Sequence, residues 1–144
     1  MRTDILRSGL VGFAFAGALL CLPAAALAQT MTYNVELSGA TENPPVETAA
    51  TGTAEVTFDP ATRVLTWSVS FEGLSGDATG AHFHGPAAPD ANAGVVVPID
   101  HTMMPITGEA TLTEEQAAQL TDGLWYVNVH TAANPGGEIR GQVQ

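Results

Sequence analysis

Two histidines separated by a single residue stand out in the segment GAHFHGPA, residues 80–87. In an extended strand, residues i and i+2 point to the same face, so His82 and His84 are expected on one side and Phe83 on the other. Their Cα atoms would lie about 6.5–7 Å apart. Two imidazoles at that spacing can converge on one metal ion, each with a nitrogen about 2 Å from it.

A third histidine lies in the segment GLWYVNVHTAANPGGEIRGQV, residues 123–143. The alternation of apolar and polar residues in this segment places His130 on the same face as Asn128 and Tyr126, away from the core. If this strand neighbours the first, three imidazoles meet. Such a site suits Cu or Zn, and an exported chain without thiols favours copper.

The segment DHTMMP, residues 100–105, offers additional candidate ligands in His101, Met103 and Met104. Imidazole and thioether together suit Cu(I). The alternative is an ordinary loop in which methionines fill gaps in the packing.

Asn128, Glu138 and Arg140 are expected to support the histidines or the fold without binding an ion. For Arg140, a structural ion pair or a clamp on backbone carbonyls is the better interpretation. Signs of catalysis are absent: no G-x-S-x-G motif occurs, and the paired Glu114 and Glu115 fall in the first turn of a predicted helix. The sequence therefore predicts no enzyme.

The elements that carry these residues are short β-rich runs separated by Gly, Pro, Asn and Asp. The predicted strands cover residues 32–39, 52–59, 63–73, 79–85, 94–100, 107–113, 124–131 and 137–143. One short helix is predicted before the penultimate strand, with Thr113 as N-cap, Gln116 completing a capping box, and a stop at Asp122 and Gly123. About eight strands and one helix predict an all-β, antiparallel sandwich or barrel.

The first 28 residues have the features of a secretory signal peptide: Arg2 and Arg7, an apolar run over residues 10–22, and small residues at Ala26 and Ala28. Cleavage after Ala28 would leave one domain, residues 29–144, without a membrane span and without the single cysteine. We therefore expect a periplasmic or secreted protein.

Charge narrows the choice of partners. The full chain has a formal net charge of −11, and removal of residues 1–28 leaves two arginines and fourteen acidic residues, a net charge of −12. Such a protein is repelled by phosphate backbones, so we expect no nucleic-acid partner. Cations are the natural small partners.

The two histidine segments together resemble the CHRD (chordin-type) domain, and the resemblance extends from about Met31 to Gln144. The matching positions are His82, His84, Gly85, Asn128, His130, Pro135, Gly136, Gly137, Glu138, Arg140 and Gly141. Membership in that family implies an immunoglobulin-like β-sandwich. The His-x-His strand is also similar to the one that holds copper in copper-zinc superoxide dismutase, although the rest of that site is missing here.

These observations favour an exported CHRD binding module that holds Cu or Zn through His82, His84 and His130. The alternative is an adhesion or interaction module in which the histidines brace loops and the partner is another exported protein or a cell-surface component. A dismutase-like copper enzyme ranks last, because the negative net charge repels superoxide.

Overall fold

The structure is a computed structural model that describes residues 29–102 and 104–144. The predicted signal peptide and Met103 lie outside the described residues. The strands are β1 Met31–Ser38, β2 Thr51–Asp59, β3 Val64–Glu72, β4 Ala78–His84, β5 Val95–Ile99, β6 Ile106–Thr111, β7 Tyr126–Thr131 and β8 Ile139–Gln142. A 3₁₀ turn spans Gly39–Thr41, and helix α1 spans Glu114–Thr121.

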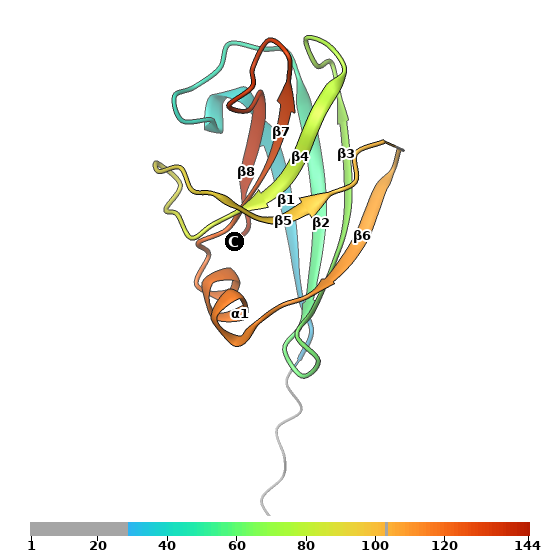
Figure 1. Ribbon diagram of the computed structural model, residues 1–144, viewed down its shortest axis with the longest axis vertical. Helices are drawn as coiled ribbons and strands as arrows, with labels where there is room; N and C mark the ends of the chain where they lie inside the picture. The colour runs from blue at the N-terminus through green and yellow to red at the C-terminus, as the bar shows by residue number, and fades with distance from the viewer. Residues whose placement is uncertain (1–28, 103) are drawn as a thin grey trace, which may run out of the picture.

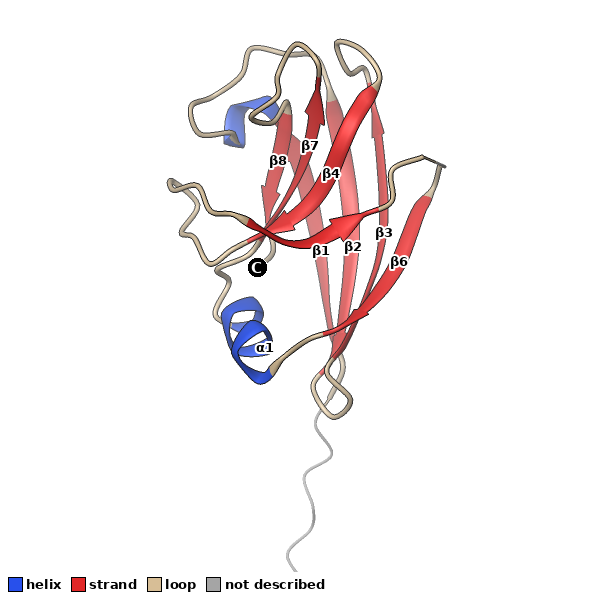
Figure 2. Cartoon of the chain, viewed as in Figure 1, coloured by secondary structure: helices blue, strands red, loops and turns tan. Residues whose placement is uncertain are grey.

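The eight strands form one antiparallel sheet in the order β5-β4-β7-β8-β1-β2-β3-β6 (Figures 1 and 2). The all-β fold, the eight strands and the helix before the penultimate strand are confirmed. The layout differs from the immunoglobulin-like sandwich that we expected. The sheet is continuous and nearly closed, hence barrel-like, because it curls until its edge strands β5 and β6 lie close together.

Strands β8 and β1 join the two halves of the sheet, β5-β4-β7-β8 and β1-β2-β3-β6, over a short stretch. Strands β1 and β8 share one register pair, Ser38 with Arg140. Gly141 permits this close approach, because a Cβ at that position would lie 2.3 Å from the carbonyl oxygen of Glu36. A side chain there would push β8 away from β1 and open the sheet.

The core lies inside the curled sheet and is built from alternate residues of each strand. Leu65, Trp67 and Val69 of β3 are buried, whereas Phe71 at the strand end is half-buried. From the other half of the sheet, Val127 and Val129 of β7 pack into the same core.

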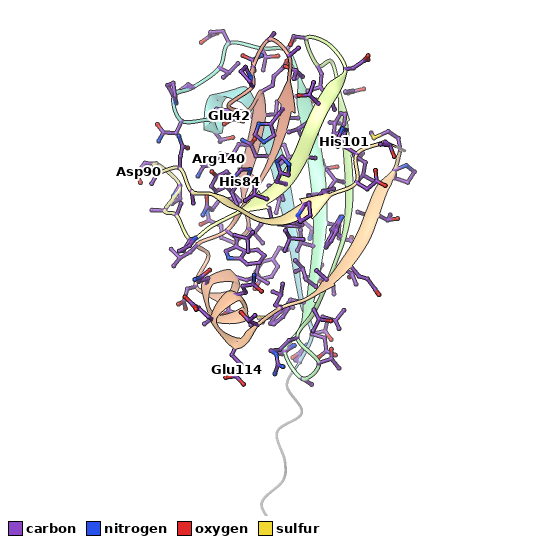
Figure 3. All side chains as sticks on the ribbon, in the orientation of Figure 1. Glu42, His84, Asp90, His101, Glu114 and Arg140 are labelled. Carbon is purple, nitrogen blue, oxygen red and sulfur yellow. The ribbon has the colours of Figure 1, made fainter. Side chains whose placement is uncertain are left out.

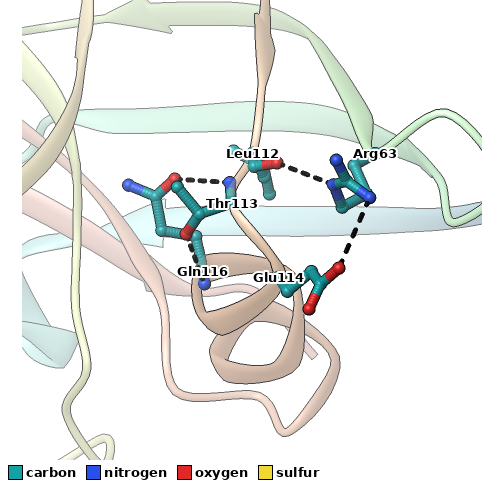
Figure 4. A network of polar contacts seen from close by, with 5 residues as sticks. All are labelled: Arg63, Leu112, Thr113, Glu114 and Gln116. Carbon is teal, nitrogen blue, oxygen red and sulfur yellow. Dashed lines mark hydrogen bonds and ion pairs between the residues drawn. The ribbon is translucent and has the colours of Figure 1, made fainter.

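Helix α1 covers one end of the core with Leu120, which is fully buried. The predicted capping box is confirmed. The Thr113 hydroxyl accepts a hydrogen bond from the Gln116 backbone N–H at 3.2 Å, and the Gln116 side chain accepts one from the Thr113 N–H at 2.9 Å (Figure 4). Arg63 donates to the Leu112 carbonyl just before the helix. Among the described residues, no helix is long and apolar enough to cross a membrane.

Replacement of the N-cap, Thr113→Ala, removes one bond of the capping box. We expect the free energy of unfolding to fall by about 1 kcal/mol and the melting temperature by roughly 4 °C, measured by thermal denaturation. The control is Thr121→Ala at the other end of the helix, where the hydroxyl donates to the Ala118 carbonyl of its own helix. An equal loss in both variants would contradict the role of the capping box.

Candidate metal centre

The register between β4 and β7 brings the three histidines together. The strands are antiparallel neighbours, with His82 opposite Asn128, Gly80 opposite His130, and His84 opposite Tyr126. All of these side-chain positions lie on the outer face of the sheet. The condition on which the predicted three-histidine site depended, that the two histidine segments are neighbouring strands, is therefore met.

Phe83, the residue between the paired histidines, anchors β4 from the inside. Its ring packs edge-on against Trp67, with centroids 5.3 Å apart, and lies 6.0 Å from the Trp125 ring. Large aromatic side chains contribute much of the burial energy of a core. This packing fixes the strand and thereby fixes the outward direction of His82 and His84.

The three imidazoles form a compact group. His82, His84 and His130 each offer a ring nitrogen, and the three nitrogens lie within 4.8 Å of one another. The shortest separation, 3.1 Å, joins His82 Nδ1 and His130 Nε2. Two nitrogens bound to one tetrahedral ion, each about 2.0 Å away, are separated by about 3.3 Å. The group therefore needs only side-chain adjustment to surround an ion.

Two backbone carbonyls orient two of the rings. His84 Nδ1 donates to the carbonyl of Ala93, and His130 Nδ1 donates to the carbonyl of Pro135, each at 3.0 Å. A ring whose Nδ1 carries the proton presents a lone pair at Nε2, which is the arrangement that metal-binding histidines adopt. His84 Nε2 is buried and has no hydrogen-bond partner among the residues described.

The hydrogen bond of His82 differs from those of the other two histidines, because its partner is a ring nitrogen and not a backbone carbonyl. Because His130 Nε2 is an acceptor, His82 Nδ1 donates its proton to it in the metal-free protein. An ion between these rings would replace that proton and be bound by His82 through Nδ1. Gly80 gives the His82 ring its space: a Cβ there would lie 3.0 Å from His82 Cε1.

The electrostatics keep all three rings neutral. Burial lowers the pKa of His82, and positive charge on His130, His84 or His101 would lower it further. Burial also lowers the pKa of His84 and of His130, against the opposing effect of their carbonyl hydrogen bonds. Neutral imidazole is the form that binds metal ions.

Behind His84, a stack of side chains runs across three strands. The Tyr126 ring lies parallel to the His84 ring, with an interplanar angle of 5° and centroids 4.9 Å apart. The Arg140 guanidinium carbon lies 3.5 Å from the Tyr126 centroid. Arg140 is 1% exposed and also donates to the Asn92 side chain and the Ala88 carbonyl. Of the two roles predicted for Arg140, the described residues contain no ion pair with Glu138, and the guanidinium contacts one backbone carbonyl, that of Ala88.

Asn128 connects the site to the loop before β2. Its amide donates to a Glu42 carboxylate oxygen at 2.8 Å. Burial raises the pKa of Glu42 to about 7, although the charge of Arg140 and the Asn128 hydrogen bond oppose this rise. Figure 3 shows Glu42, Arg140 and His84 on the same flank of the molecule.

Glu138 holds loops together. Its carboxylate, which is 0% exposed, accepts hydrogen bonds from the Thr48 hydroxyl, from the Ser75 N–H and hydroxyl, and from the Thr131 hydroxyl. Burial alone would raise the pKa of Glu138, but these four hydrogen bonds lower it to about 2. The Glu138 carboxylate therefore has a structural role, because its oxygens already accept these four hydrogen bonds.

Among the described residues, the group of ring nitrogens within 4.8 Å does not include His101, one of the additional ligands predicted from DHTMMP. His101 is half-exposed and lies beyond the end of β5 (Figure 3). Met104 is 50% exposed, and Met103 lies outside the described residues. His101 is close enough for its charge to lower the pKa of His82.

Comparison with known proteins identifies the family. The model of the CHRD domain family matches residues 33–143. The chain belongs to the CHRD domain family. No curated protein and no solved structure matched the chain.

Within this CHRD domain, sequence analysis overlooked residues whose side chains carry no metal-binding motif. Glu42 was missed because it lies in a loop far from both histidine segments. The role of Tyr126 as a stacking partner was also missed, although its place on the outer face was predicted. The role of Pro135 was missed as well: its backbone carbonyl orients His130.

The hydrogen bonds predict a particular tautomer for two rings. In metal-free protein at pH 7.5, His84 and His130 should both be neutral with the proton on Nδ1. Long-range ¹H–¹⁵N correlation spectra measure this directly. Because burial lowers both pKa values, the imidazolium form should appear only below the ordinary value of 6.5. Nε2-protonated rings would contradict the carbonyl contacts.

Glu138→Gln should lower the melting temperature by several degrees at pH 7, because hydrogen bonds to a buried charge are strong. A carboxyl with a lowered pKa stabilises the fold above its unfolded-state value and loses that contribution on acidification. The difference between wild type and variant should therefore shrink as the pH falls from about 4.5 to about 2. Glu109→Gln, at an exposed position, is the control; a pH-independent difference for Glu138→Gln would contradict the assignment.

Proposed function

We propose that this CHRD domain is an exported module that binds a copper or zinc ion through His82, His84 and His130. The observation that carries the proposal is the group of three ring nitrogens within 4.8 Å. The buried, unpartnered Nε2 of His84 supports it, because a buried polar atom without a partner is costly unless something binds there.

The chemistry of the ligands favours these metals. Neutral imidazole nitrogens suit Cu and Zn, whereas Ca²⁺ and Mg²⁺ require oxygen ligands. An ion would be bound by Nε2 of His84 and His130 and by Nδ1 of His82. Three protein ligands leave a fourth position for water or another small ligand.

The features of the chain outside the site are consistent with metal capture after export. The amino-terminal signal pattern directs the chain to the periplasm or the medium. The net charge of −12 on residues 29–144 raises the local concentration of cations around the protein. We propose a binding role and no catalytic one, since Arg140 is buried and cannot guide an anionic substrate to the site.

One observation favours a second candidate, an adhesion or interaction module without metal. His82 and His130 are hydrogen-bonded to each other, and the contacts of His84 and His130 with carbonyl groups brace two turns. In that case the histidines stabilise the outer face, and the partner is another exported protein or a cell-surface component.

Calorimetric titration of residues 29–144 with Cu²⁺ and with Zn²⁺ at pH 7.5 distinguishes the two. Wild type should bind one equivalent, and His82→Ala should weaken binding by roughly a hundredfold or more, because one of three ligands is lost. The matched control is His101→Ala, which should change affinity by less than about threefold. Affinity should fall as the pH drops below about 6.5, where protons compete for the rings.

The second candidate gives the opposite results. Wild type would release no binding heat, and His82→Ala would lower the melting temperature equally with and without added metal. A loss in His101→Ala as large as that in His82→Ala would instead make His101 a further ligand.

A further inference from the structure

A buried positive charge lies directly behind the three-histidine group. Strand β7 lies between β4 and β8, so His84 from β4 and Arg140 from β8 stack on opposite faces of Tyr126. Arg140 is 1% exposed, so water screens its charge poorly. The aromatic ring holds the guanidinium at a fixed distance from the His84 ring.

The neighbours of this guanidinium do not neutralise it. Its hydrogen-bond acceptors are the side-chain oxygens of Asn92 and Gln142 and the carbonyl of Ala88, all uncharged. Among the described residues, no carboxylate oxygen lies within 4.0 Å of it. The nearby Glu42 compensates only in part at neutral pH, because burial raises its pKa to about 7.

Building on the proposed function, we infer that Arg140 shifts the affinity of the centre by about tenfold toward Cu(I), relative to Cu²⁺ and Zn²⁺. Three neutral imidazoles contribute no negative charge to the site. The ligands therefore do not offset the repulsion between the guanidinium and the metal ion. This repulsion doubles when the ion carries two charges. At a separation on the order of 10 Å in a partly buried site, each unit of ionic charge weakens binding by about tenfold.

The test compares wild type with Arg140→Gln and Arg140→Lys. Affinities for Cu(I), Cu²⁺ and Zn²⁺ are measured at pH 7 by competition with chromophoric chelators, with Cu(I) handled under anaerobic reducing conditions. Arg140→Gln removes the charge and should strengthen Cu²⁺ and Zn²⁺ relative to Cu(I) by about tenfold. Arg140→Lys loses the stacking on Tyr126 but keeps the charge, and it should leave the ratio within about threefold of wild type. The two variants both alter the packing and differ in charge, so their comparison separates the effect of the charge from that of the packing.

An equal ratio of Cu²⁺ to Cu(I) affinity in all three proteins, or a ratio that moves toward Cu(I) in Arg140→Gln, overturns the inference while the metal site stands. If Arg140→Gln does not fold, Arg140→Met is the second neutral variant. A wild type that binds none of the three ions overturns the proposed function, and this inference with it.

Discussion

The antiparallel pairing of β4 with β7 is the constraint on which the site depends. One register places Gly80 opposite His130 and His84 opposite Tyr126. A slip of one residue would turn His82 and His84 into the core and Phe83 out of it. The burial of Phe83 against Trp67 and Trp125 makes that slip costly. The same apolar contacts that stabilise the core therefore also determine which three imidazoles meet.

Above these strands the protein builds a polar layer that is largely buried. Burying Glu138 and Arg140 is unfavourable unless each is fully hydrogen-bonded. Glu138 meets the requirement through hydroxyl groups and an N–H, and Arg140 through neutral oxygens and the Tyr126 ring. Several of the donors and acceptors, at Thr48, Ser75 and Asn92, come from loops, so the buried Glu138 and Arg140 hold these loops over the sheet.

Much of the fold could be predicted from the sequence because alternation and capping are local patterns. The face of Val127 and Val129, the outward direction of His130 and the capping box at Thr113 follow from period and spacing alone. The curl of the sheet into one nearly closed layer could not be predicted from the sequence, because it depends on the contact between β1 and β8 at Gly141. The contact of Glu42 with Asn128 could not be predicted from the sequence either, since a long loop brings these two residues together.

The rings of His84 and His130 are oriented by main-chain oxygens of Ala93 and Pro135. The acceptor in each case is a group that every amino acid carries. Substitutions at these two positions can therefore leave the imidazoles in place as long as the path of the backbone is unchanged. The site can thus persist while the sequences of its surrounding turns diverge, and its loss is expected from insertions or deletions there more than from point changes.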